Sequence, residues 1–151
     1  MFRPRQNLKN DHEKRWFQSD RVFFGFGACH ILAGVFLDDP PIDGFYGEWI
    51  IPSEGFCGTH MYVTNGYLAF DFHGYSVREK LLSKYWRGYQ RLYPDWSAKI
   101  AKIDFPLLDT TELNKRKHLG PEQYFKDPRP RAKQFIKRIK LLALLAVDKI
   151  N

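Results

Sequence analysis

The stretch GTHMYVTNGYLAFDFHG, residues 58–74, determines the centre of this fold. It carries one Asn-Gly pair, Asn65-Gly66, between two segments in which apolar residues recur at alternate positions. Asn-Gly in that setting predicts a two-residue type I′ β-hairpin, because both central residues must adopt positive φ. We therefore expect two antiparallel strands joined at this pair.

The predicted register brings two ionisable side chains together. With Asn65-Gly66 as the turn, Val63 faces Leu68 and, farther from the turn, His60 faces Asp71. Directly opposed residues have β-carbons about 4.5 to 5.5 Å apart, which allows a hydrogen bond between imidazole and carboxylate. The simpler alternative is a cross-strand pair that only stabilises the sheet. The other face of the hairpin is apolar and should join the core; it comprises Met61, Val63, Leu68 and Phe70.

The rest of the chain predicts alternating helices and strands. We expect a helix from about Cys29 to Leu37, a strand ended by Pro52, and a helix opened by a Ser76-x-x-Glu79 capping box and running to about Arg91. Residues 97–105 should contain a strand, although the three-residue spacing of Ile100 and Ile103 also allows a helical turn. A short helix from Asp109 or Thr110 to Gly120 and an amphipathic helix over residues 130–150 should follow. This order predicts an α+β domain with a small antiparallel sheet. We expect a flexible basic arm over residues 1–18 and a single domain over residues 19–151.

Composition restricts the partners and the compartment. The 151 residues suit one domain, and the formal charge of +7 favours an acidic protein, nucleic acid or anionic lipid as partner. The apolar run LLALLAV, residues 141–147, is too short to cross a bilayer. Two cysteines do not make a disulfide framework, and the N-terminus has no apolar signal-like stretch. These features lead us to expect a cytoplasmic protein with free thiols.

Cys29 has the setting of an activated thiol. It follows FGFGA, residues 24–28, and opens the first predicted helix. The partial positive charge at a helix N-terminus lowers a thiol pKa, and an unpaired first-turn amide can donate to a developing oxyanion. The alternative is a buried structural cysteine. His30 should point about 100° away around the helix, which favours packing or substrate contact over a role as the base.

Cys57 is the other candidate thiol, but it lies in a loop with no helix terminus to activate it. We therefore assign it to the surface or to the rim of a substrate site. A zinc site could be composed from Cys29, His30, Cys57 and His60, but the usual Cys-x2–4-Cys spacing is absent. We expect no metal and no cofactor.

The order of these residues resembles the papain-like superfamily, in its transglutaminase-like and arylamine N-acetyltransferase-like branches. In those enzymes a cysteine opens a helix packed on a sheet, and successive strands supply histidine and aspartate. THMYVTNGYLAFDFHGY, residues 59–75, is similar to their histidine-to-aspartate pattern, and the resemblance covers residues 25–75. Phe23 stands where papain-like peptidases place an oxyanion-hole glutamine, so the second oxyanion donor is not identified.

These observations predict a Cys-His-Asp acyl-transfer site. Cys29 is the expected nucleophile, His60 the base and later the acid, and Asp71 the group that orients the imidazole. The reaction would be cleavage or acyl transfer on an amide, ester or thioester, including one in a protein. Candidate substrate-binding residues are His30, Trp49, Cys57, Tyr62 and His73. The alternative is a non-enzymatic module whose basic residues 114–140 bind an acidic protein or nucleic acid. The oligomeric state is left open.

Overall fold

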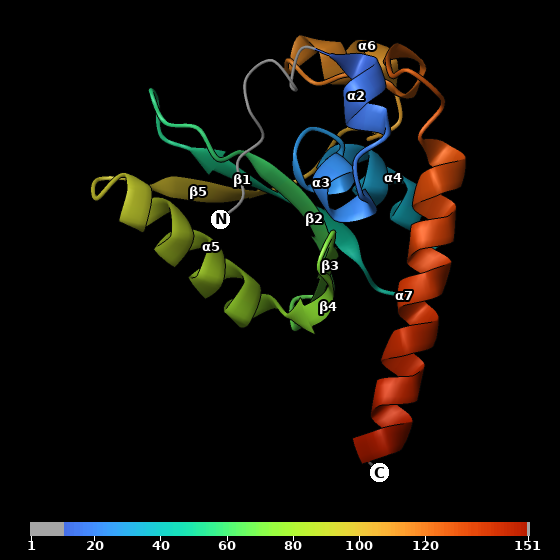
Figure 1. Cartoon of the computed structure of the whole chain (residues 1–151). Coiled ribbons are helices and arrows are strands. Elements are labelled where there is room, and N and C mark those ends of the chain that lie inside the picture. Colours follow the sequence, from blue (N-terminus) through green and yellow to red (C-terminus); the bar gives the residue numbers. More distant parts are fainter. Residues whose placement is uncertain (1–10, 151) are drawn as a thin grey trace.

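A five-stranded antiparallel sheet lies between two helical layers (Figure 1). The computed structural model describes residues 11–150, with side chains described as far as residue 139. The strand order is β4-β3-β2-β1-β5, with α5 on one face and α4 and α7 on the other. The predicted α+β class with an antiparallel sheet is therefore confirmed. None of the helices in the described part has the length and apolar character needed to span a bilayer.

The element bounds agree with most of the predicted segments. The strands are β1 (Tyr46–Pro52), β2 (His60–Thr64), β3 (Leu68–Asp71), β4 (Gly74–Val77) and β5 (Ala98–Lys102). The helices are α2 (His12–Trp16), α3 (Asp20–Gly25), α4 (Cys29–Asp38), α5 (Arg78–Leu92), α6 (Thr110–Lys115), the 3₁₀ turn η1 (Pro121–Gln123) and α7 (Arg129–Ile150).

Helix α4 forms the centre of the larger core. All residues from Cys29 to Phe36 are buried, so the helix is enclosed on every side. It packs against Met61 and Val63 of β2 and against Phe135 of α7 in one apolar cluster. A helix that is apolar all round is stable only inside a protein, which accounts for its central position.

The other face of the sheet is also covered. Tyr62 and Ala69 form a second cluster with Tyr89 and Trp96, beneath the partly buried face of α5. The hairpin face that carries His60 and Asp71 is therefore not a solvent face. The amphipathic sequence of α5 buries its apolar side there.

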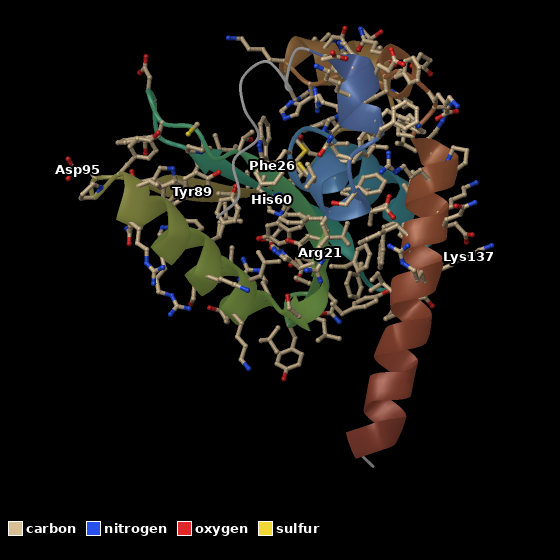
Figure 2. The ribbon with its side chains drawn as sticks, in the orientation of Figure 1. Arg21, Phe26, His60, Tyr89, Asp95 and Lys137 are labelled. Atoms are coloured by element: carbon tan, nitrogen blue, oxygen red, sulfur yellow. The ribbon has the colours of Figure 1, made fainter. Side chains whose placement is uncertain are left out.

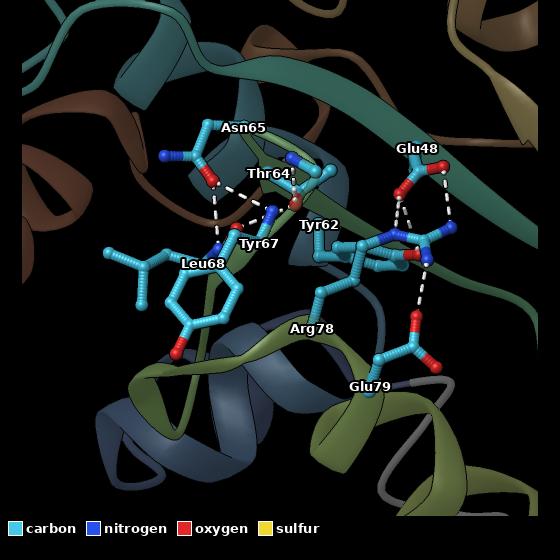
Figure 3. A network of polar contacts seen from close by, with 9 residues as sticks. Glu48, Tyr62, Thr64, Asn65, Tyr67, Leu68, Arg78 and Glu79 are labelled. Carbon is cyan, nitrogen blue, oxygen red and sulfur yellow. Dashed lines mark hydrogen bonds and ion pairs between the residues drawn. The ribbon is translucent and has the colours of Figure 1, made fainter.

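The hairpin forms, but its register differs from the predicted one. Val63 pairs with Phe70 rather than with Leu68, and Asn65 N–H donates to Leu68 O, so Gly66 and Tyr67 are the central turn residues. The Asn65 Oδ1 atom accepts hydrogen bonds from Tyr67 N and Leu68 N (Figure 3). Of the two central turn residues, Gly66 takes a positive φ, of 97°, and Tyr67 does not. Asn65 itself does not take the left-handed conformation that a type I′ turn would require. Its side chain instead accepts hydrogen bonds from the turn amides.

The predicted capping box is wrong. Ser76 pairs with Ala69 inside β4, a strand that the sequence analysis missed, and α5 begins at Arg78 without a side-chain cap. The second hairpin pairs Asp71 with Gly74, which takes a positive φ of 95° and ends the turn. The Ser76-x-x-Glu79 pattern therefore spans the end of a strand and does not cap a helix.

Within the predicted N-terminal arm, residues 11–18 include a helix that the sequence did not indicate. This stretch contains α2, and Trp16 contacts Phe23 edge-on with ring centroids 5.3 Å apart. Residues 1–10 lie outside the described part of the chain. The short helix α6 ends at Lys115, before the predicted Gly120, because Lys117 adopts a positive φ of 62°.

An ion pair joins the start of α5 to the central sheet (Figure 3). Arg78 donates from Nε to Glu48 Oε1 at 2.7 Å and from Nη2 to Glu48 Oε2 at 3.1 Å. Tyr62 donates its hydroxyl proton to Glu48 Oε1 at 3.1 Å. The Glu48 side chain is 9% exposed, so this bidentate pair is strong and fixes where α5 begins.

We expect Glu48→Gln to lower the free energy of unfolding by about 2 kcal/mol, because it leaves the partly buried Arg78 with only the exposed Glu79 as a carboxylate partner. Tyr62→Phe is the matched control. It removes one hydrogen bond and retains the ion pair, so it should cost about 1 kcal/mol or less. Urea denaturation measures the free energy of unfolding of both variants. Equal losses of stability would show that the ion pair contributes no more than the single hydrogen bond from Tyr62.

Candidate active site

The helix α4 begins directly at the thiol, and the loop before it is held from two sides. Arg15 Nη2 donates to Phe26 O at 3.0 Å, and Tyr124 donates its hydroxyl proton to Gly27 O at 2.7 Å. Gly27 takes a φ of 120°, which residues with a side chain rarely adopt, so glycine is favoured here. A β-carbon would also lie 1.9 Å from Arg15 Nη2 and displace that guanidinium. These contacts set the position of Cys29.

Cys29 lies where α4 meets the first residues of β2. Its side chain is buried, at 9% exposure, and Met61 N–H donates to Sγ at 3.5 Å. The first intrahelical bonds run from the amides of Ile31 and Leu32 to Ala28 O. The Cys29 amide precedes them at the helix N-terminus, where it can donate to a developing oxyanion.

His60 and Asp71 make the predicted contact. The distance from His60 Nε2 to Asp71 Oδ2 is 3.0 Å, and the two side chains are 2% and 4% exposed. His60 and Asp71 are diagonal neighbours on the two strands and do not face each other directly, because the observed register differs from the predicted one by two residues. A two-residue move preserves the face of every side chain, so the imidazole still reaches the carboxylate. With Nε2 held by Asp71, Nδ1 is the nitrogen available to a thiol.

The electrostatics favour an ion pair between thiolate and imidazolium. Burial alone would raise the pKa of the Cys29 thiol, but interactions with His30 and His60 outweigh it and hold that pKa well below its usual value. Burial alone would lower the pKa of His60, but Asp71 and Cys29 outweigh it and raise that pKa to about 9. The Asp71 pKa lies below its usual value because hydrogen bonds from His60 and His73 overcome the effect of burial. Each charge in the group is therefore stabilised by a neighbour.

Aromatic rings fix the plane of the His60 imidazole. Tyr85 of α5 stacks on it with centroids 5.3 Å apart and planes 12° apart, and Phe72 meets it edge-on at 5.6 Å. Tyr85 donates its hydroxyl proton to Gly58 O at 2.7 Å, which ties α5 to the loop before β2. Tyr85 is absent from the predicted site residues, because helical periodicity shows which side of α5 is apolar but not which face of the sheet that side covers.

His30 lies behind the thiol in a second polar group. Its Nε2 donates to Leu119 O at 2.7 Å, and its ring is 5.0 Å from that of His118. Its buried Nδ1 makes no hydrogen bond within the described residues. A backbone carbonyl carries no full charge to stabilise an imidazolium, whereas Asp71 does so for His60. His60 is therefore the better base.

A groove with a volume of about 1730 Å³ opens over these residues. Arg21, Phe26, His60 and Tyr89, which are labelled in Figure 2, all line the groove. The sequence-predicted residues that line it are Cys29, His30, Cys57, His60, Asp71 and His73. It thus contains the whole predicted catalytic group.

Two predicted substrate-binding residues lie elsewhere. Trp49 donates from Nε1 to Thr59 Oγ1 at 2.6 Å and contacts Phe105, and it is not a lining residue. Tyr62 is buried beneath the imidazole and binds Glu48.

His73 is half-exposed in the β3–β4 turn, with Nδ1 3.5 Å from Asp71 Oδ1. It lines the groove, where a substrate-binding residue is expected to lie.

The zinc alternative receives no support from the geometry. Within the described residues, no three or more side chains of His, Cys, Asp or Glu form a group that could hold a metal. Cys57 is exposed, whereas Cys29 is buried at the helix terminus, and neither forms a disulfide.

Comparisons with known proteins do not assign the chain to a family. No protein-family model matches it, and no curated protein or solved structure matches it significantly.

We expect Asp71→Asn to bring the His60 pKa down from about 9, because the neutral amide no longer stabilises the imidazolium. His73→Ala is the control; it removes a half-exposed ring that also contacts Asp71 and should leave the His60 pKa near its original value. NMR titration of the imidazole protons measures both variants. An unchanged His60 pKa in Asp71→Asn would exclude Asp71 as its main partner.

Proposed function

We propose that the protein is a thiol-dependent hydrolase or acyltransferase that acts on an amide, ester or thioester carbonyl. The observation that carries the proposal is the buried His60–Asp71 pair beside Cys29, with the thiol pKa lowered and the imidazole pKa raised. Opposite shifts of this kind favour transfer of the thiol proton to the imidazole before substrate arrives.

Acylation begins with attack of the Cys29 thiolate on the carbonyl carbon, which moves one electron pair onto the carbonyl oxygen. The Cys29 amide at the start of α4 donates to that oxyanion. When the tetrahedral intermediate collapses, the bond to the leaving group breaks, and the proton on His60 passes to that group. The products are a thioester on Cys29 and neutral His60.

Deacylation reverses these roles. His60 accepts a proton from water or an amine as its oxygen or nitrogen attacks the thioester carbonyl. Collapse of this second intermediate breaks the bond to sulfur, and the thiolate and imidazolium form again. Asp71 keeps Nε2 protonated throughout, so Nδ1 is the atom that exchanges the proton.

The direct test is iodoacetamide alkylation of Cys29 and Cys57, followed separately by mass spectrometry from pH 4 to 10. At pH 6 we expect Cys29 to react about ten- to a hundredfold faster than Cys57, because only a paired thiol is ionised there. His60→Ala should remove that advantage. If Cys29 is inert, or if both cysteines react as ordinary thiols in both proteins, the proposal is wrong.

The pH dependence of turnover provides a second test. The proton that His60 gives to the leaving group is lost as pH rises through the His60 pKa of about 9. The kcat/KM for a p-nitrophenyl ester or an anilide should therefore fall above about pH 9, more steeply for the anilide, whose leaving group needs the proton. Cys29→Ser should show no activity and no acyl adduct. A profile that is flat to pH 10 for the anilide would exclude His60 as the acid.

A further inference from the structure

The groove is larger than a site for a small molecule. Its volume of about 1730 Å³ exceeds the roughly 300–1,000 Å³ typical of small-ligand pockets. It extends from Arg21 and Phe26, past the thiol, along α5 as far as Arg91. An elongated ligand can occupy such a groove, with one carbonyl placed over Cys29.

The lining of the groove is strongly basic. It includes six basic side chains: Arg15, Arg21, Lys80, Lys84, Arg87 and Arg91. Its two carboxylates are both engaged, since Asp71 binds His60 and Glu79 pairs with Arg78. An excess of cations in a cleft concentrates anionic ligands there.

Four of these cations form a stripe on α5. Lys80, Lys84, Arg87 and Arg91 follow one another at intervals of four, three and four residues, so they share one side of the helix. All four are exposed. Among the described residues, no carboxylate forms an ion pair with any of them. They are available to a ligand.

The length of the stripe indicates the size of the ligand. Lys80 and Arg91 are eleven positions apart, which is about 16 Å along a helix. An extended peptide covers that length with about five residues at roughly 3.3 Å each. A single phosphate or carboxylate could meet only one or two of the four charges.

We propose that this groove binds an acidic polypeptide segment that lies along α5 and presents its carbonyl to Cys29. The inference rests on the proposed function in one respect, the choice of polypeptide over nucleic acid. An activated thiol attacks a carbonyl carbon, and a nucleic acid backbone offers phosphodiesters instead. The charge and length of the groove would suit either polymer.

The test uses Cys29→Ser, which binds without turnover, and fluorescein-labelled hexapeptides at 50 mM salt. Hexaglutamate should bind at least tenfold more tightly than hexaglutamine, and 300 mM salt should remove most of that preference. Equal binding of the two peptides would overturn the inference. Hexathymidylate is the third ligand, and tighter binding of this oligonucleotide than of hexaglutamate would also overturn it.

A charge-matched pair of variants locates the binding site. Lys84→Gln with Arg91→Gln should weaken hexaglutamate binding about three- to tenfold, because two exposed ion pairs are lost. The control is Lys133→Gln with Lys137→Gln, which removes the same net charge from exposed positions on α7; Figure 2 shows Lys137 far from His60. The control should bind as the parent does. Equal effects of the two pairs would show a response to net charge alone and would overturn the inference.

Protection of the thiol separates this inference from the proposed function. Hexaglutamate should slow alkylation of Cys29 in the wild-type protein, whereas hexaglutamine should not. If Cys29 is activated but hexaglutamate neither binds nor protects, the acidic-polypeptide inference fails and the proposed function stands. If hexaglutamate binds through Lys84 and Arg91 but Cys29 has no enhanced reactivity, the binding groove stands and the proposed function fails.

Discussion

The enclosure of α4 between the sheet and α7 is the constraint on which the rest of the structure depends. A helix buried on every side can reach solvent only at its ends, so Cys29, its first residue, lies at the boundary between core and groove. Because α4 packs against β2, the same boundary is where β2 begins, and Met61 N–H reaches the sulfur there. One packing contact thus places the helix N-terminus, the thiol and His60 together.

The candidate site is built from all three layers of the fold. Cys29 comes from one helical layer, His60 and Asp71 from the sheet, and the aromatic cover of the imidazole from Tyr85 in the opposite layer. Burial would oppose each charge separately. Burial of the three charged forms is tolerated because the Cys29 thiolate, the His60 imidazolium and the Asp71 carboxylate alternate in sign. Each charge therefore offsets the desolvation cost of its neighbour. The Glu48–Arg78 pair contributes indirectly by fixing the start of the helix that carries Tyr85.

The basic residues divide into two groups that the sequence does not distinguish. Within residues 114–140, Arg116 lies over the Phe105 ring and Arg131 binds Asp20, so part of this predicted binding stretch supports the fold. On α5, Lys84 and Arg91 stay exposed beside the groove. A net charge of +7 counts both groups equally. Only the location of carboxylates and aromatic rings separates structural cations from available ones.

The sequence by itself determined the hairpin, the helix that opens at Cys29 and the common face of His60 and Asp71. These follow from local rules: turn chemistry, helical and strand periodicity, and the alternation of side chains along a strand. Only the tertiary structure decided the true turn at Gly66-Tyr67, the extra strand β4, the covering of the second sheet face by α5 and the groove itself. The predicted His60–Asp71 contact survived because a two-residue change of register preserves strand faces. No local sequence pattern predicts how the helical layers pack on the sheet or where the groove lies between them. Both depend on which apolar surfaces, far apart in the sequence, come into contact.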